Sequence, residues 1–123
     1  MVVITNSFAT ANSVIGGGAG AKSNAVIVTG PGSMMTNNGN LILGYGATAS
    51  TSPGGSNSLT IANGAAVNVT GTTFIAFNNT NGSGGITLNG GTLSTLAVNS
   101  DPTNITGTGL LVTRSAIADR TFS

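Results

Sequence analysis

The chain of 123 residues has no cysteine, no histidine and no tryptophan, and only five of its side chains are charged. Without cysteine it forms neither a disulfide nor a thiolate, and without histidine it lacks the commonest acid-base group and metal ligand at neutral pH. The charged residues are Lys22, Asp101, Arg114, Asp119 and Arg120. They form no basic stripe, so we expect no nucleic-acid partner.

Asp101 and Asp119 are the only acidic residues, and both lie near the C-terminal end of the sequence. A glycan-cleaving enzyme needs two carboxyl groups about 5 to 9 Å apart, and calcium takes roughly 6 to 8 oxygen ligands. Two solvated charges in an irregular tail explain the pair more simply. We therefore expect no enzyme, and no catalytic, metal-binding or cofactor-binding residues.

No targeting or membrane-spanning segment is visible in the sequence. Residues 1–6 lack a basic region followed by a long apolar stretch, and no window approaches the roughly 18 apolar residues of a membrane helix. We expect no membrane insertion. If the protein is exported, the chain is a mature form or an excised piece.

Small and turn-forming residues dominate the composition: Gly, Ala, Ser, Thr and Asn account for 81 of the 123 residues. Leu, Ile, Val and Phe add 30 more, about a quarter of the chain, which exceeds the roughly 20% below which a chain is disordered. Thr, Val and Ile favour strands, while Gly and Asn favour turns. The composition predicts an ordered all-β protein with a single domain over residues 1–123.

Two short phrases recur along the chain. The first is a serine followed by alternating apolar residues, and it begins at residues 23, 56 and 83, with spacings of 33 and 27 residues. The second is an apolar pair followed by a small residue, and it begins at Val14, Ile42 and Phe74. A period of roughly 20 to 50 residues is typical of stacked repeats.

The repeat predicts a parallel β-helix, or β-solenoid. In its clearest copy, apolar runs at 59–61, 67–69 and 75–77 are separated by the turn signals Asn63-Gly64 and Thr70-Gly71. Three strands and their corners make one coil, so we expect three to four coils of roughly 27–33 residues, with three strands per coil. The expected coils are 2–22, 23–55, 56–82 and 83–99, followed by an irregular or strand-exchanging tail at 100–123 that holds one more strand at 110–114.

An antiparallel hairpin protein is the alternative interpretation, because Asn-Gly is also the strongest signal for a tight hairpin turn. A hairpin meander does not need equivalent residues at a fixed spacing, whereas a solenoid places each inward side chain on its counterpart one coil below. The phased repeat therefore favours the β-helix. Within it, the low-complexity residues 47–55 are expected to bulge from one corner as a loop.

Two groups of apolar residues are candidates for an interface. If the second residue of each recurring apolar pair points inward, alternation turns the first residue outward. This predicts a vertical stripe of exposed side chains, formed by Val14, Ile42 and Phe74. Such a stripe marks an interface, or it lies beneath a loop or the tail of the same chain. The tail offers a second group that could add a strand to a neighbour's sheet: Leu110, Leu111 and Val112.

Two other patterns suggest ligands but have simpler explanations. Residues 16–23 come within one residue of a phosphate-binding loop, yet the segment that follows reads as a strand, where such a loop needs a helix. This segment is therefore interpreted as a solenoid corner. Thr60 and Thr87 share a register position that an ice-binding threonine ladder would need, but Ile27 interrupts the row.

Residues 24–33, 39–45, 57–64 and 86–93 combine these strands and corners, as in Asn24-Ala-Val-Ile-Val-Thr-Gly-Pro-Gly-Ser33 and Ile86-Thr-Leu-Asn-Gly-Gly-Thr-Leu93. They resemble the repeats of autotransporter-associated β-strand proteins, and the resemblance covers roughly residues 12–98. Those proteins are large bacterial surface or secreted proteins with β-helical passenger regions, far longer than this chain. The resemblance implies an extracellular or cell-surface location and a structural or adhesive role, and it transfers no catalytic residue.

The function expected from the sequence is structural. The chain would be a rod segment, or a self-assembling filament or fibre subunit, of a bacterial surface or matrix. Its partner would be itself, joined head to tail or by strand addition, because neither end carries a helix or charge cluster as a cap. The alternative is an adhesin-type binding module that presents the 47–55 loop to glycans or another cell surface.

Overall fold

The computed structural model describes residues 1–16, 21–44, 56–75, 84–99, 104–114 and 120–122. These residues form strands and the corners between them, and no α-helix occurs among them. In chain order the strands are β1 (Val2–Ile4), β2 (Ser7–Thr10), β3 (Ser13–Ile15), β4 (Ala25–Thr29), β5 (Met34–Asn37), β6 (Leu41–Leu43), β7 (Asn57–Ala62), β8 (Ala66–Val69), β9 (Thr72–Ile75), β10 (Gly84–Thr95), β11 (Ala97–Asn99), β12 (Ile105–Thr113) and β13 (Arg120–Phe122). The prediction of an all-β protein is confirmed for this part of the chain.

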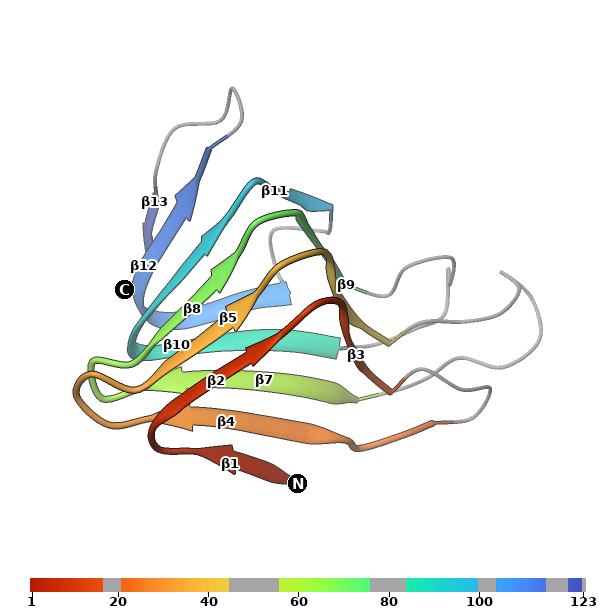
Figure 1. The fold of residues 1–123 in the computed structure, drawn as a ribbon, viewed down its shortest axis with the longest axis horizontal. Helices are drawn as coiled ribbons and strands as arrows, with labels where there is room; N and C mark the ends of the chain where they lie inside the picture. Colours follow the sequence, from red (N-terminus) through yellow and green to blue (C-terminus); the bar gives the residue numbers. More distant parts are fainter. Residues whose placement is uncertain (17–20, 45–55, 76–83, 100–103, 115–119, 123) are drawn as a thin grey trace.

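The strands fall into three groups of side-by-side neighbours (Figure 1). The first strand group contains β1, β4, β7, the first part of β10 and the first part of β12. The second strand group contains β2, β5, β8 and the remaining parts of β10 and β12. The third strand group contains β3, β6, β9 and β11.

Strand direction separates the two predicted architectures. All pairs within the three strand groups are parallel, and the one antiparallel pair in the described residues joins β12 to β13. A tight hairpin turn joins antiparallel strands only. The antiparallel hairpin interpretation is therefore wrong for these residues, and the predicted parallel arrangement is confirmed.

The first two strand groups belong to one sheet that turns back on itself and is nearly closed, because β10 passes through both groups. The register of β10 shifts between Asn89 and Thr92, where the strand bends. Gly90 has a φ of +77°, and a Cβ on Gly91 would lie 2.5 Å from the carbonyl oxygen of Ile61. The bend therefore needs two glycines, one for its backbone angle and one for its close approach to β7.

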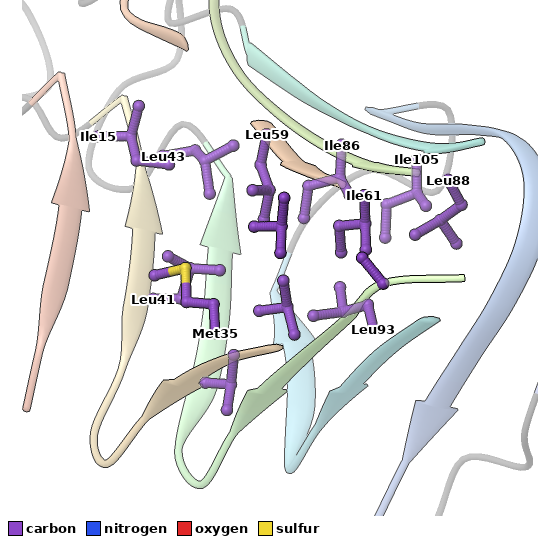
Figure 2. Close-up of a cluster of buried hydrophobic side chains, with 14 of the residues drawn as sticks. Ile15, Met35, Leu41, Leu43, Leu59, Ile61, Ile86, Leu88, Leu93 and Ile105 are labelled. Atoms are coloured by element: carbon purple, nitrogen blue, oxygen red, sulfur yellow. The ribbon is translucent and has the colours of Figure 1, made fainter. Parts of the chain in front are cut away.

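The core consists of inward side chains that lie over one another in successive strands. In the first strand group, Val28 is in register with Ile61, and Ile61 is in register with Leu88; all three are buried. Leu41 and Leu43 of β6 contribute to the same cluster from the third strand group. Figure 2 shows these apolar side chains gathered between the strands.

Asn57 is a buried polar residue at the start of β7. Its Oδ1 accepts hydrogen bonds from the backbone N of Asn24 (3.1 Å) and from Asn24 Nδ2 (3.0 Å), and its Nδ2 donates to the carbonyl oxygen of Ala21 (3.2 Å). Any Cβ at Gly16 would overlap the Asn57 side chain. The Asn57 side chain therefore links the start of β7 to the segment that precedes β4. It fits there because Gly16 has no side chain.

A second corner repeats one asparagine contact in successive strands. The backbone N of Asn40 donates to Asn12 Oδ1 (2.9 Å), and the backbone N of Thr72 donates to Asn40 Oδ1 (2.9 Å). Gly39 and Gly71 lie against these two Oδ1 atoms, so closely that a Cβ at either position would overlap them. This geometry explains why Gly-Asn at 39–40 and Gly-Thr at 71–72 occupy equivalent corners.

Replacing Asn57 with alanine tests the corner contacts. We expect Asn57→Ala to lower the free energy of unfolding by about 2 kcal/mol, because it removes the three hydrogen bonds that the buried Asn57 side chain makes to Asn24 and Ala21. Urea unfolding followed by circular dichroism measures the change.

Asn68→Ala is the matched control. Asn68 is half-buried, and its Nδ2 contacts Met34 Sδ at 3.5 Å in an exposed setting. We expect this control to change stability by less than about 0.5 kcal/mol. Equal losses for the two variants would contradict a specific role for Asn57.

Candidate functional site

The structure places the three residues of the predicted stripe side by side on the third strand group. Val14 is in register with Ile42, and Ile42 is in register with Phe74. Val14 is 50% exposed, whereas Ile42 and Phe74 are half-buried. Neighbouring parallel strands lie about 4.8 Å apart, so these side chains form one apolar row in register, in which Val14 is the most exposed.

The stripe has a buried counterpart and a polar border. The next residues along the three strands are Ile15, Leu43 and Ile75, which are in register with one another and buried. On the next strand, β11, the position beside Phe74 is held by Asn99, which is exposed. The apolar stripe therefore extends over β3, β6 and β9 and stops at β11.

The tail residues Leu110, Leu111 and Val112 lie on β12, away from the third strand group and in the larger sheet. Leu111 is buried in the core, Leu110 is exposed, and Val112 is half-buried. One side of this segment pairs with β10 and the other pairs with β13. To add a strand to a neighbouring molecule, the segment would first have to leave these partners.

Several buried polar groups were not identified from the sequence. Thr73 Oγ1 lies 3.0 Å from Thr95 Oγ1, and Thr95 Oγ1 lies 3.1 Å from the carbonyl oxygens of Gly71 and Ala97. Asn37 is fully buried, and its Nδ2 donates to the carbonyl oxygen of Gly39 (2.9 Å). The Thr73–Thr95 and Thr95–Gly71 contacts join neighbouring strands. The Asn37–Gly39 contact lies within one corner, and the buried Oδ1 of Asn37 has no hydrogen-bond partner among the described residues.

Arg114 follows β12 and connects it to two earlier strands. Its Nη1 donates to Ser94 Oγ (2.7 Å), and its Nη2 donates to the carbonyl oxygen of Val69. The guanidinium group can make several such contacts because it carries five N–H donors in a fixed plane. One of the few charges of the chain therefore anchors the end of β12.

The threonine row is longer than the sequence indicated. Thr60 is in register with Thr87, and Thr87 is in register with Thr106, while Ile27 lies on the other side of Thr60 as expected. Thr87 and Thr106 are exposed, and Thr60 is half-buried. Thr106 was missed because it lies in the part of the chain that was expected to be an irregular tail.

The remaining sequence candidates are placed only in part. Residues 17–20 and the whole 47–55 loop lie outside the described residues, as do Asp101 and Asp119. The segment after the glycine-rich stretch is β4, a strand, whereas a phosphate-binding loop would precede a helix. Gly16, at the start of that stretch, lies against Asn57 as part of a corner.

Within the described ranges, no three His, Cys, Asp or Glu residues lie together in a way that could hold a metal ion. The same ranges contain no helix long and apolar enough to cross a membrane. The resemblance of residues 12–98 to autotransporter-associated repeats stays a prediction. Compared with protein-family models, with curated proteins and with solved structures, the chain has no match.

Proposed function

We propose that the chain is a parallel β-helix with three strands per coil, and that it serves as a structural rod segment or fibre subunit of an extracellular bacterial surface or matrix. The observation that carries the proposal is the order of strand pairing. β1, β4, β7 and β10 are neighbours, as are β2, β5 and β8, and as are β3, β6 and β9. From β1 to β7, each strand therefore lies beside the one three places later, as expected when a coil has three strands; β8 and β9 pair with β10 and β11 because β10 bends through two strand groups.

The distribution of polar groups supports a structural role. Asn57, Thr73 and Thr95 are buried, and their hydrogen bonds run to other parts of the same chain. Arg114 likewise contacts Ser94 and Val69. A catalytic site needs polar groups directed toward a substrate, whereas these groups hold neighbouring strands together. The extracellular bacterial setting of the proposal comes from the resemblance of residues 12–98.

The proposed partner is a second copy of the chain. The stripe of Val14, Ile42 and Phe74 is an apolar row on one side of the stack, and such surfaces favour association. Sideways contact between stripes would bundle rods into a fibre. The described charged residues lie outside β3, β6 and β9, so no like charges oppose one another across this contact.

Nuclear magnetic resonance of the 11.8 kDa chain tests the proposed coil. A parallel β-helix predicts nuclear Overhauser contacts between backbone protons of residues in register, from Val26 to Leu59 and from Leu59 to Ile86. The third strand group should give the matching series from Val14 through Ile42 to Phe74. Contacts typical of antiparallel strands among these residues would overturn the proposal.

Replacing Val14 with aspartate tests the role of the stripe in assembly. We expect Val14→Asp to weaken sideways association at least about tenfold, because a charge would have to be buried against apolar side chains. Sedimentation velocity measures the change, and electron microscopy should show bundles of wild-type rods that the variant lacks. Far-ultraviolet circular dichroism should stay the same.

Leu96→Asp is the control for this variant. Leu96 is an apolar residue of similar exposure, 43%, but it precedes β11 and lies outside the stripe. We expect it to leave association unchanged. Wild-type particles that stay single at high concentration would refute self-assembly, and equal effects of the two variants would refute the role of the stripe.

A further inference from the structure

Several asparagines of the chain are followed directly by glycine, and such pairs are chemically reactive. The glycine N attacks Cγ of the asparagine side chain, and the lack of a Cβ on glycine leaves that nitrogen accessible. The bond from Cγ to Nδ2 breaks, and Nδ2 leaves as ammonia with the proton of the glycine N. Water then opens the five-membered succinimide ring to give aspartate or isoaspartate. The reaction needs no enzyme, so its speed depends on how firmly the chain holds the peptide group.

The pairs that lie in the described residues are 38–39, 63–64 and 89–90, while the pair 81–82 lies outside them. All three have the same two side chains, so the sequence alone does not rank them. Their surroundings in the fold differ. The structure therefore decides which of them reacts first.

Hydrogen bonds to a neighbouring strand hold two of the three pairs. Gly64 N donates to the carbonyl oxygen of Gly90 (2.9 Å), and Asn63 Nδ2 donates to Thr29 Oγ1 (3.0 Å). The carbonyl oxygen of Asn89 accepts from the backbone N of Asn63 (3.0 Å). Before either pair can form a succinimide, its peptide group has to turn and give up these bonds. Both pairs are therefore protected by the stacking of the strands.

The pair Asn38–Gly39 lies at the corner between β5 and β6. Asn38 is exposed, and its side chain makes no hydrogen bond within the described residues. In the same part of the chain, neither the carbonyl oxygen of Asn38 nor the N–H of Gly39 has a hydrogen-bond partner. The corner is held on either side, because Asn38 N donates to the carbonyl oxygen of Thr10 (2.8 Å) and the Gly39 carbonyl oxygen accepts from Gly71 N (3.0 Å). The peptide group between these two anchors is not held.

From this difference we infer that Asn38 is a site of spontaneous modification, which the folded chain converts to aspartate or isoaspartate ahead of Asn63 and Asn89. Aspartate keeps the backbone as it is and adds a negative charge at an exposed position. Isoaspartate directs the main chain through the former side chain, so the backbone gains a carbon atom before Gly39. The two products therefore have different consequences for the corner.

A longer backbone disturbs the contacts of Gly39. This residue packs so closely that a Cβ on it would overlap Asn12 Oδ1, the atom that accepts the N–H of Asn40. Its carbonyl oxygen accepts from Asn37 Nδ2 (2.9 Å) as well as from Gly71 N. An extra backbone atom displaces Gly39 from this arrangement. Isoaspartate therefore loosens the connection between the second and third strand groups.

Hydroxylamine measures the reaction at each pair, because it cleaves the chain where a succinimide has formed. In mildly alkaline buffer the folded chain should give the fragments 1–38 and 39–123, which mass spectrometry identifies. Cleavage after residue 63 or 89 should be at least about fivefold slower, since hydrogen bonds have to break first. In urea the fold is lost, so the three rates should become similar.

Three results would overturn the inference. One is faster cleavage after residue 63 or 89 than after residue 38 in the folded chain. Another is a folded chain that resists cleavage after residue 38 while the unfolded chain is cut there. The third is an equal preference for residue 38 in the folded and unfolded chains, which would show that the fold does not select the site.

Two variants at the same position provide the controls. Asn38→Gln should abolish cleavage after residue 38 and leave the other two sites unchanged, because glutamine would have to close a larger ring. Asn38→Asp carries the new charge without the longer backbone. Freshly prepared Asn38→Asp should unfold at the same urea concentration as fresh wild-type chain, whereas aged wild-type chain with isoaspartate should unfold at a lower one. Equal midpoints for the aged wild-type chain and Asn38→Asp would contradict the loosening of the corner.

Discussion

The rest of the structure depends on one constraint: each strand lies parallel to an equivalent strand, with equivalent residues in register. Ile4, Val28, Ile61 and Leu88 form such a row, so an inward position in one strand is an inward position in the next. An apolar side chain then packs on another apolar side chain along the stack. A buried polar side chain can find its partner in a neighbouring strand, as Thr73 does with Thr95, or in its own corner, as Asn37 does with Gly39.

The unusual composition follows from this constraint. A charged residue that recurred in register would face its own copy about 4.8 Å away, and like charges placed directly opposite are destabilising. An amide or hydroxyl group carries both donor and acceptor, so it can bond to a group of its own kind. Asn24 does this with Asn57, and Thr73 does it with Thr95. At equivalent corners, Asn12 and Asn40 each accept a backbone N–H from a neighbouring segment. Glycine is needed where such a side chain lies close to the neighbouring backbone, as at Gly39 and Gly71.

The repeat allowed the register to be predicted where its two phrases recur. The phrase at residues 23, 56 and 83 leads into the row of Val26, Leu59 and Ile86, and the second phrase leads into the stripe of Val14, Ile42 and Phe74. The position of the stripe was predictable because strands alternate their faces. Whether the stripe is an interface depends on which molecule or segment packs against it, and the alternation of residues along a strand carries no information about that partner.

The parts that the sequence did not predict lie where the spacing changes. β12 starts at Ile105, earlier than the strand expected at 110–114, and its first residues pair with Ile86 after a much shorter interval than the repeat. The interval is shortened because β10 runs from the first strand group into the second without a separate connection. The buried state of Asn57 was also not predictable, because it depends on the space that Gly16, just after β3, leaves beside it.

Stacks of this kind have no intrinsic end, since each in-register row offers the same apolar residues and the same backbone groups to the next strand. A strand that continued in parallel would extend the stack and expose another edge. β13 reverses direction on β12, so the rows do not continue through it. Within the described residues, the rows therefore end where strand direction reverses, although the strands before β13 repeat one another in parallel.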